Sequence, residues 1–325
     1  MQARTGGFNQ IRSGLMELSY SPCLEKFIDV SSKLNEEETL DAQREAYSLS
    51  SQSLGLRMPD GVEFYDEVVQ TRDHAVPVRH YQVRETAPGS LIVYFHGGGW
   101  VKGDLNSHHE VVAGIAAATG TEMLAVDYPL APENRHPAQL LSGYAVLQHV
   151  EARRAAGAID GPVLVAGDSA GGQIAAALCM LARQEGGPAI CGQILIYPAL
   201  DHRCHSDSYA RFAEGPLLTY ASSREYWKAF IPQSGDTAHF LSPLLEKNMA
   251  GLPPAIIQLA ENDVLHDEAM AFGMRLQNEG VSVDVLDGPG MVHGFVRAIG
   301  LSDGAKREFD RMCVKIAKLI DRLSA

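Results

Sequence analysis

The sequence contains few cysteines and no motif that pairs them with one another or with histidines. There are five among 325 residues, an odd number, and none forms a C-x-x-C pair. Neither a disulfide framework nor a zinc site is expected, and free thiols are typical of a reducing compartment. No apolar run reaches the ~18 residues of a membrane span, and the N-terminus lacks the apolar core of a signal peptide. We therefore predict a cytoplasmic location and no membrane partner.

The chain also lacks an excess of positive charge. Its 27 basic residues are outnumbered by 40 acidic ones, which gives a formal net charge of −13. An acidic surface repels nucleic acid, so we predict no nucleic-acid partner. The hydrophobic content of 46% is enough for a large buried core. A chain of this length favours one large α/β domain with an insertion or a small cap over two equal domains.

Short apolar segments alternate with longer amphipathic ones along most of the chain. An antiparallel pair is expected at 62–70 and 74–83. Further strands are expected at 90–95, 122–128, 162–168, 191–198, 254–260 and 281–287, and helices at 108–120, 136–157, 171–186, 266–279 and 303–323. Alternation of this kind, with nearly wholly apolar strands, is typical of a mostly parallel sheet that helices cover on both faces.

Two segments do not follow this alternation. Residues 1–57 have a helical pattern, and residues 201–250 are polar and irregular, with one expected helix around 222–230. The α/β core would then comprise 58–200 and 251–325, interrupted by an insertion after the sixth strand. Ligands bind at the carboxyl edge of open α/β sheets, so we predict that both segments form a helical cap over that edge.

A nucleophile motif joins an expected strand to an expected helix. Residues 167–171 read GDSAG and match G-x-S-x-G. In this context the turn is tight enough to require glycine on both sides of the serine, and it exposes the hydroxyl at the sheet edge. We therefore predict that Ser169 is a catalytic nucleophile. An ordinary glycine-rich turn between a strand and a helix is the alternative.

Three successive glycines, residues 97–99, follow the strand expected at 90–95. Their backbone N–H groups are unhindered and suited to converge on an oxygen that becomes negative during acyl transfer. The N–H of Ala170, the residue after the nucleophile, is expected to join them. A flexible loop is the alternative interpretation.

The general base and its acid are expected after late strands, in the chain order serine, acid, histidine. His293 lies in a glycine-rich loop after 281–287 and fits the base. Asp263 is the first aspartate after 254–260 and is the preferred acid, with Asp267 and then Glu261 as alternatives. Asp104, Glu133 and Asp168 are interpreted as structural carboxylates that bind backbone N–H groups in the surrounding loops.

Several motifs together resemble the hormone-sensitive-lipase-like branch of the α/β hydrolases, in its bacterial esterase form. They are HGGGW at 96–100, GD at 103–104, DYPLAPE at 127–133, GDSAGG at 167–172, DVLHD at 263–267 and HGF at 293–295. They extend over most of the core in the expected order. One departure is Val264, where the family usually has proline after the acid.

The resemblance implies a triad of Ser169, Asp263 and His293. It also implies an oxyanion hole formed by the N–H groups of Gly98, Gly99 and Ala170, with Gly97 shaping the loop, and a possible homodimer. The expected activity is hydrolysis of short- to medium-chain acyl esters through an acyl-enzyme, with a small-molecule ester as partner and no metal or cofactor.

Alternative activities have the same motifs. An amidase, an arylformamidase or a carbamate hydrolase would use the same triad. The family also includes plant receptors without catalysis, but these lose the histidine that this chain keeps as His293. Six insertion residues are expected to line an apolar pocket or to form the core of the cap itself: Tyr209, Phe212, Leu217, Leu218, Tyr220 and Trp227.

Overall fold

The structure is a computed structural model that describes residues 24–34, 37–71, 75–84, 89–234 and 240–325. Within these residues, the strands form one sheet in the order β1-β2-β4-β3-β5-β6-β7-β8. The strands are β1 (Val62–Gln70), β2 (Ala75–Val83), β3 (Leu91–Phe95), β4 (Glu122–Val126), β5 (Val163–Asp168), β6 (Gly192–Ile196), β7 (Ala255–Gln258) and β8 (Val283–Leu286). Neighbours from β4 to β8 are parallel, and β2 pairs antiparallel with both β1 and β4. The predicted mostly parallel α/β sheet is confirmed.

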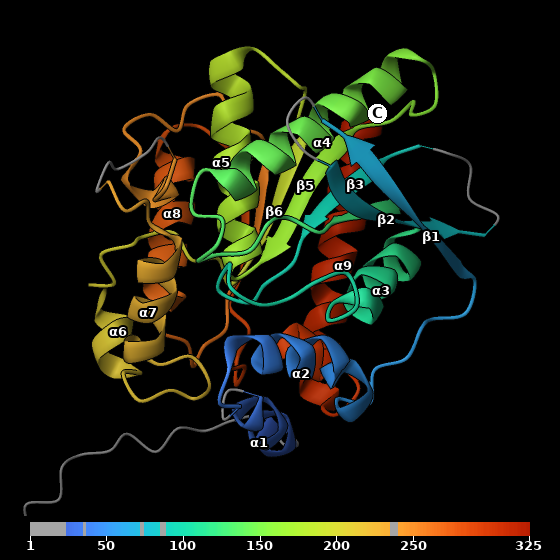
Figure 1. Cartoon of the computed structure of the whole chain (residues 1–325). Coiled ribbons are helices and arrows are strands. Elements are labelled where there is room, and N and C mark those ends of the chain that lie inside the picture. Colours follow the sequence, from blue (N-terminus) through green and yellow to red (C-terminus); the bar gives the residue numbers. More distant parts are fainter. Residues whose placement is uncertain (1–23, 35–36, 72–74, 85–88, 235–239) are drawn as a thin grey trace, which may run out of the picture.

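Strands β3 to β7 are almost wholly buried, whereas β1 is largely exposed. Successive side chains of a strand point to opposite faces of the sheet, so both faces are buried along these central strands. In β3, Leu91, Val93 and Phe95 belong to one apolar cluster, whereas Ile92 and Tyr94 belong to another. Helices α4 (Ala138–Ala155), α5 (Ala170–Glu185) and α8 (His266–Asn278) pack in the first cluster. Helices α3 (His109–Thr119) and α9 (Asp303–Ser324) pack in the second. Figure 1 shows α4 and α5 on one side of the sheet and α3 and α9 on the other.

The remaining helices gather at the end of the molecule toward which the β5 and β6 arrows point (Figure 1). They are α1 (Leu24–Lys33), α2 (Leu40–Ser53), α6 (Asp207–Arg211) and α7 (Tyr220–Phe230). Two short 3-10 turns, η1 (Pro243–Leu245) and η2 (Phe295–Ala298), come before β7 and after β8. Helices α1 and α2 match the helical pattern predicted before residue 57, although residues 1–23 of that segment lie outside the described residues. Helix α7 is the one predicted in the insertion.

Arg44 attaches α2 to the core. Its Nε–H donates to the carbonyl oxygen of Val101 at 2.8 Å, and Nη2 donates to that of Ala131 at 2.9 Å. The same guanidinium forms two hydrogen bonds to the carboxylate of Glu133, at 2.9 and 2.8 Å. These hydrogen bonds fix helix α2 against Val101, which follows the glycine run, and against the segment that contains Ala131 and Glu133.

None of the helices in the described part of the chain combines the length and the apolar character that a membrane span requires.

Candidate active site

Ser169 occupies the turn between β5 and α5 in a backbone conformation that side chains rarely adopt, with φ 54° and ψ −117°. Its N–H donates to the carbonyl oxygen of Ile196 at 2.8 Å, which ties the turn to the neighbouring strand. The flanking glycines are needed for space. A Cβ on Gly167 would lie 2.3 Å from the backbone of Gly171, and one on Gly171 would lie 1.9 Å from the carbonyl oxygen of Phe95. The turn is therefore the tight strand-to-helix turn that the motif predicts.

The three side chains predicted to act together lie in one hydrogen-bonded chain. His293 Nδ1 is 2.7 Å from Oδ2 of Asp263, and His293 Nε2 is 2.9 Å from Oγ of Ser169. A carboxylate only accepts, so Nδ1–H is the donor to Asp263 and Nε2 is left to accept from the serine hydroxyl. Asp263 is 1% exposed, and its Oδ1 accepts from the N–H of Leu265 at 3.0 Å. These contacts fix the imidazole in the orientation that a general base for Ser169 requires.

The two alternative acids have other partners. Asp267 Oδ1 accepts from Arg211 Nη2 at 2.9 Å and lies 2.7 Å from His266 Nδ1. Glu261 Oε2 accepts from the N–H of Gly290 at 2.6 Å. The position of Val264 after the acid is buried, and its carbonyl oxygen accepts from the hydroxyl of Ser208 at 2.6 Å. The contacts of Glu261 and of the Val264 carbonyl thus hold the loop that carries Asp263, although the proline usual in the family at position 264 is absent.

The glycine run faces Ser169 across the sheet edge. Gly98 and Gly99 have positive φ angles of 123° and 62°, and both line the same cavity as Ser169 and Ala170. A Cβ on Gly98 would lie 2.2 Å from the carbonyl oxygen of Lys102, and one on Gly99 would lie 2.5 Å from the ring of Tyr226. Only glycine fits this loop at both positions, because the backbone angles and the neighbouring atoms each exclude a side chain.

Asp168 connects the glycine run to the residue before the nucleophile. Its Oδ1 accepts from the N–H of Gly97 and from the hydroxyl of Tyr94, each at 2.8 Å. Burial on its own raises the pKa of this carboxyl, but the charge of His108, 3.4 Å away, and the hydrogen bond from Tyr94 overcome this effect and lower the pKa to about 2. The carboxylate is therefore ionised at neutral pH and acts as a fixed acceptor within the core.

Asp104 and Glu133 bind to groups in the surrounding loops. Asp104 Oδ1 accepts from the N–H groups of Asn106 and Ser107, at 3.0 and 2.7 Å. Glu133 pairs with Arg44 as described above. The structure therefore places neither carboxylate in the hydrogen-bonded chain of His293. Asp104 binds backbone N–H groups as predicted, whereas the partner of Glu133 is a guanidinium.

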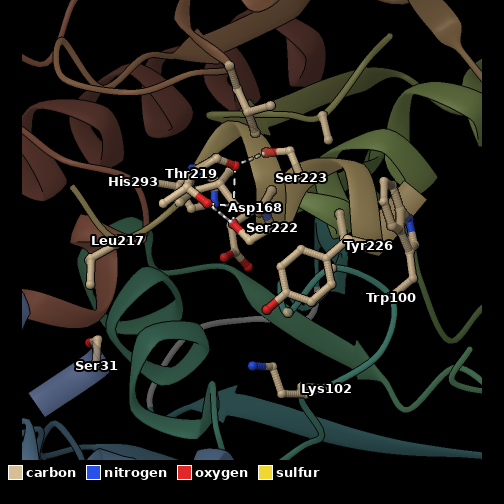
Figure 2. A pocket seen from close by; sticks show the side chains of 18 of the residues that line it. Ser31, Trp100, Lys102, Asp168, Leu217, Thr219, Ser222, Ser223, Tyr226 and His293 are labelled. Atoms are coloured by element: carbon tan, nitrogen blue, oxygen red, sulfur yellow. Dashed lines mark hydrogen bonds between the residues drawn. The ribbon is translucent and has the colours of Figure 1, made fainter. Parts of the chain in front are cut away.

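The site opens into a cavity of about 490 Å³ between the sheet edge and helices α1, α2 and α7. Figure 2 shows His293, Asp168 and Tyr226 around its interior, with Thr219, Ser222 and Ser223 at the start of α7. Of the six insertion residues predicted for a pocket or a cap core, Leu217, Leu218 and Trp227 line the cavity. The others do not: Tyr209 and Phe212 are buried in the core, and Tyr220 is 41% exposed.

The polar and aromatic residues of the cavity wall that were not predicted include Tyr47, Lys102, Tyr226 and Arg297. Tyr47 comes from α2, Tyr226 from α7 and Arg297 from η2, and Lys102 follows the glycine run. None lies in a catalytic motif, and their convergence depends on how the helices sit above the sheet. Two of the four lie close to a motif in the sequence, since Lys102 follows HGGGW and Arg297 follows HGF. The sequence has no comparable signal for Tyr47 and Tyr226.

Within the described ranges, no three histidine, cysteine, aspartate or glutamate side chains are grouped so that they could hold a metal ion.

The sheet order, the turn at Ser169 and the glycine run together define an α/β hydrolase. A protein family with the α/β-hydrolase fold matches residues 92–297, which include the glycine run, the turn at Ser169 and strands β4 to β8. The chain belongs to this family, in its hormone-sensitive-lipase-like branch, as the motifs predicted.

Several relatives of known name are similar to this chain. The carboxylic ester hydrolase LipN of Mycobacterium tuberculosis is 37% identical over 238 residues, which cover 71% of this chain but only 63% of LipN. The match therefore spans less than two thirds of that relative. An ethyl acetate hydrolase of Pseudomonas putida is 34% identical over 241 residues, which cover 71% of this chain and 75% of the relative.

Solved structures of esterases have the same fold. A thermostable esterase from Pseudomonas putida superposes with a TM-score of 0.85 at 26% identity, covering 95% of this chain and 99% of that one. A hyperthermophilic esterase from Pyrobaculum calidifontis superposes with a TM-score of 0.83 at 26% identity, covering 93% and 99%. The similarity thus includes the N-terminal and inserted helices as well as the core.

Proposed function

We propose that this chain is a carboxylic ester hydrolase that acts on short- to medium-chain acyl esters, with Ser169, His293 and Asp263 as its catalytic triad. The observation that carries the proposal is the hydrogen-bonded chain from Asp263 through His293 to Ser169, which ends at a cavity that Gly98 and Gly99 also line. The relatives named as ester hydrolases and esterases support the same reaction class.

The proposed reaction proceeds in two steps. His293 Nε2 accepts the hydroxyl proton as Ser169 Oγ attacks the ester carbonyl carbon, and the carbonyl oxygen becomes an oxyanion. The C–O bond to the alcohol then breaks, and the alcohol leaves with the proton from His293. In the second step His293 takes a proton from water, which attacks the acyl-enzyme, and Ser169 regains its proton as the acid leaves. Asp263 stabilises the imidazolium form of His293 in both steps.

The N–H groups of Gly98, Gly99 and Ala170 are proposed to bind the oxyanion. Fixed backbone donors in a site with little water stabilise a developing negative charge more than water does. The Asp168 contact to Gly97 holds the start of the loop, and α5 begins at Ala170, so its N-terminus also favours negative charge.

The size of the cavity supports short to medium acyl chains. A volume of about 490 Å³ lies at the lower end of the range for small-molecule sites. Phe27, Leu217 and Trp227 give part of the wall an apolar surface suited to an aliphatic chain. We further propose that residues 24–57 and 201–250 act as a cap, because α1, α2 and α7 supply one side of this cavity.

Turnover of p-nitrophenyl esters by wild type and Ser169→Ala tests the proposal. We expect hydrolysis of the acetate and butyrate esters by the wild type and a loss of about 10⁴-fold or more in kcat for the variant, because the nucleophile is removed. The exposed Ser53 provides a matched control, and Ser53→Ala is expected to keep wild-type turnover. Near-normal turnover by a folded Ser169→Ala would contradict the proposal, and an optimum at the palmitate ester would contradict the chain-length range.

A cytoplasmic location, a homodimer and the absence of a nucleic-acid partner stay predictions from the sequence. Light scattering during size-exclusion chromatography tests the homodimer directly, since it gives the mass of the assembly in solution.

A further inference from the structure

The ring of Tyr226 packs against the glycine run in the cavity that contains Ser169. Tyr226 lies on helix α7, and a Cβ on Gly99 would lie 2.5 Å from its ring. Both residues line the cavity. The length of an aromatic ring therefore separates the phenol hydroxyl of Tyr226 from the proposed oxyanion hole, which is within the span of a small substrate.

The hydroxyl of Tyr226 keeps its proton available to a bound molecule. Figure 2 shows it turned away from Trp100, and no hydrogen bond within the described part of the chain involves it. Lys102 Nζ lies 5.6 Å from the ring centroid, on the hydroxyl side, but an ammonium donates hydrogen bonds and accepts none. Burial raises the pKa of Tyr226 to about 12, so the hydroxyl is a donor at neutral pH.

Other hydroxyls of the same wall are bonded within the protein. Thr219 Oγ1 accepts from the N–H of Ser222 at 3.0 Å, and the Ser222 hydroxyl donates to the Thr219 carbonyl oxygen at 3.1 Å. The Ser223 hydroxyl donates to the same carbonyl oxygen at 2.9 Å. These three hydroxyls cap the start of α7, whereas that of Tyr226, one turn further along the helix, is left to contact a substrate.

The position of His293 determines which half of an ester would meet Tyr226. In the proposed reaction the alcohol leaves with a proton from His293, so the alcohol half of the ester lies beside the imidazole. Figure 2 shows His293 and Tyr226 on opposite sides of Asp168, the residue before the nucleophile. The acyl half, which stays attached to Ser169, therefore extends toward Tyr226.

We propose that Tyr226 selects esters whose acyl group carries a ketone or hydroxyl oxygen a few carbon atoms from the ester carbonyl. The Tyr226 hydroxyl donates a hydrogen bond to this oxygen while the ester carbonyl lies at the glycine run. The inference rests on the proposed ester hydrolysis and names its substrate class. A hydrocarbon chain in the same place would leave the donor unpaired, and a site that hydrogen-bonds a substrate discriminates against the analogue that lacks the polar group.

The proposal is tested by kcat/KM for two p-nitrophenyl esters of the same shape. One carries a 4-oxopentanoyl group, and the other carries a 4-methylpentanoyl group, in which a methyl group replaces the ketone oxygen. Because the two esters differ in intrinsic reactivity, the quantity compared between proteins is the ratio of kcat/KM for the oxo ester to that for the methyl ester. We expect this ratio to fall by about tenfold in Tyr226→Phe, which removes only the hydroxyl.

Tyr226→Phe keeps the aromatic ring against Gly99, so its turnover of the methyl ester should equal or exceed that of the wild type. Tyr220→Phe is the matched control, because Tyr220 lies on the same helix but is 41% exposed and outside the cavity lining, and it should keep the wild-type ratio. An equal loss for both esters in Tyr226→Phe would mean that Tyr226 only supports the shape of the site. That result would overturn the proposal, as would an unchanged ratio.

Inhibition of the wild type provides a measurement that needs no variant. The amide 4-oxopentanamide should inhibit butyrate ester hydrolysis more strongly than 4-methylpentanamide, although it is the less apolar of the two. Equal or weaker inhibition by the oxo amide would contradict the proposal even if Tyr226→Phe does not fold, and it would leave the proposed ester hydrolysis intact. A failure to hydrolyse any p-nitrophenyl ester would refute the proposed function instead. Calorimetry with the two amides would then test the Tyr226 contact alone, and equal affinities would overturn it.

Discussion

The N–H of Gly97 donates to Oδ1 of Asp168 at 2.8 Å, so the residue before the nucleophile holds the start of the glycine run. Gly97 lies just after β3 and Asp168 is the last residue of the neighbouring parallel strand β5, so this contact joins the two segments at the carboxyl edge of the sheet. The proposed oxyanion hole takes donors from beside both ends of the contact, since Gly98 and Gly99 follow Gly97 and Ala170 lies two residues after Asp168. Asp168 is therefore a positioning residue that acts through the loop.

Loss of the Asp168 contact should lower kcat more than it raises KM, because a misplaced oxyanion donor weakens binding of the transition state. We expect Asp168→Ala to reduce kcat by about 10²-fold, the scale associated with a displacement of ~1 Å at a catalytic site. Asp168→Asn retains an oxygen acceptor and should fall between the wild type and Asp168→Ala. Steady-state kinetics with p-nitrophenyl butyrate check the order, and equal kcat values in folded variants would contradict it.

The choice of Asp263 over Asp267 as the acid of the triad is tested by substituting each aspartate in turn. Asp263→Asn removes the charge that holds His293 in the required tautomer, so kcat should fall by about 10³–10⁴-fold. Asp267→Asn changes a carboxylate that contacts Arg211 and His266, and it should keep kcat within about tenfold of the wild type. Kinetics of both variants at pH 7.5 make the comparison. A larger loss of kcat in Asp267→Asn than in Asp263→Asn would indicate that Asp267, and not Asp263, is the acid.

The tight turn at Ser169 predicts a large difference in stability between alanine variants of Gly171, in the first turn of α5, and Gly186, which follows its last residue. Gly171→Ala would place a Cβ 1.9 Å from the carbonyl oxygen of Phe95, and the backbone must shift to relieve the contact. We expect it to lower the free energy of unfolding by about 3 kcal/mol. Gly186 also has a positive φ, of 73°, but no atom lies within 4 Å of its Cβ position, so Gly186→Ala should cost about 1 kcal/mol. Urea unfolding measures both, and equal losses would refute the steric argument.

His96 makes stability depend on pH. Burial, and then the charge of His108, lowers its pKa from 6.5 to about 4. Below pH 6.5, His96 is therefore protonated in the unfolded chain, whereas in the folded chain it stays neutral until the pH falls to about 4. The contribution of His96 to the free energy of unfolding is fully present above pH 6.5. It decreases as the pH falls, by about 2 kcal/mol between pH 7 and pH 5.

Urea unfolding at pH 7 and pH 5 checks this dependence. His96→Gln cannot titrate, so its stability should decrease by about 2 kcal/mol less than that of the wild type over the same interval. His205→Gln is the control, because His205 is an exposed histidine, with its side chain 60% exposed. If the wild type and His96→Gln lose the same amount, His96 is not the group responsible.

Much of the fold and the hydrogen-bonded triad follow from local sequence patterns. Apolar strands, glycine stops and the G-x-S-x-G turn each depend on neighbours in the chain, so their positions were predicted closely. Asp263 was preferred to Asp267 because it follows its strand sooner, and the structure brings it to His293 at 2.7 Å. The five-residue helix α6 was not predicted, since so short a segment has no helical periodicity to detect.

The cavity wall was predicted less well, because it depends on packing between distant segments. Tyr47 and Tyr226 reach the site from α2 and α7, and their contacts with Lys102 follow from how these helices lie over the sheet. Tyr209 and Phe212 have the same aromatic character as the lining residues but are buried elsewhere. Composition alone does not separate the two groups.

The central claim is that Ser169 is an activated nucleophile, and the most direct test is covalent labelling with a fluorophosphonate followed by intact-mass and peptide analysis. The account predicts one adduct per chain, located on Ser169. It also predicts that labelling is lost in Ser169→Ala and strongly slowed in a variant that lacks the His293 imidazole. A wild type that does not react, or an adduct that persists in Ser169→Ala, would contradict the account.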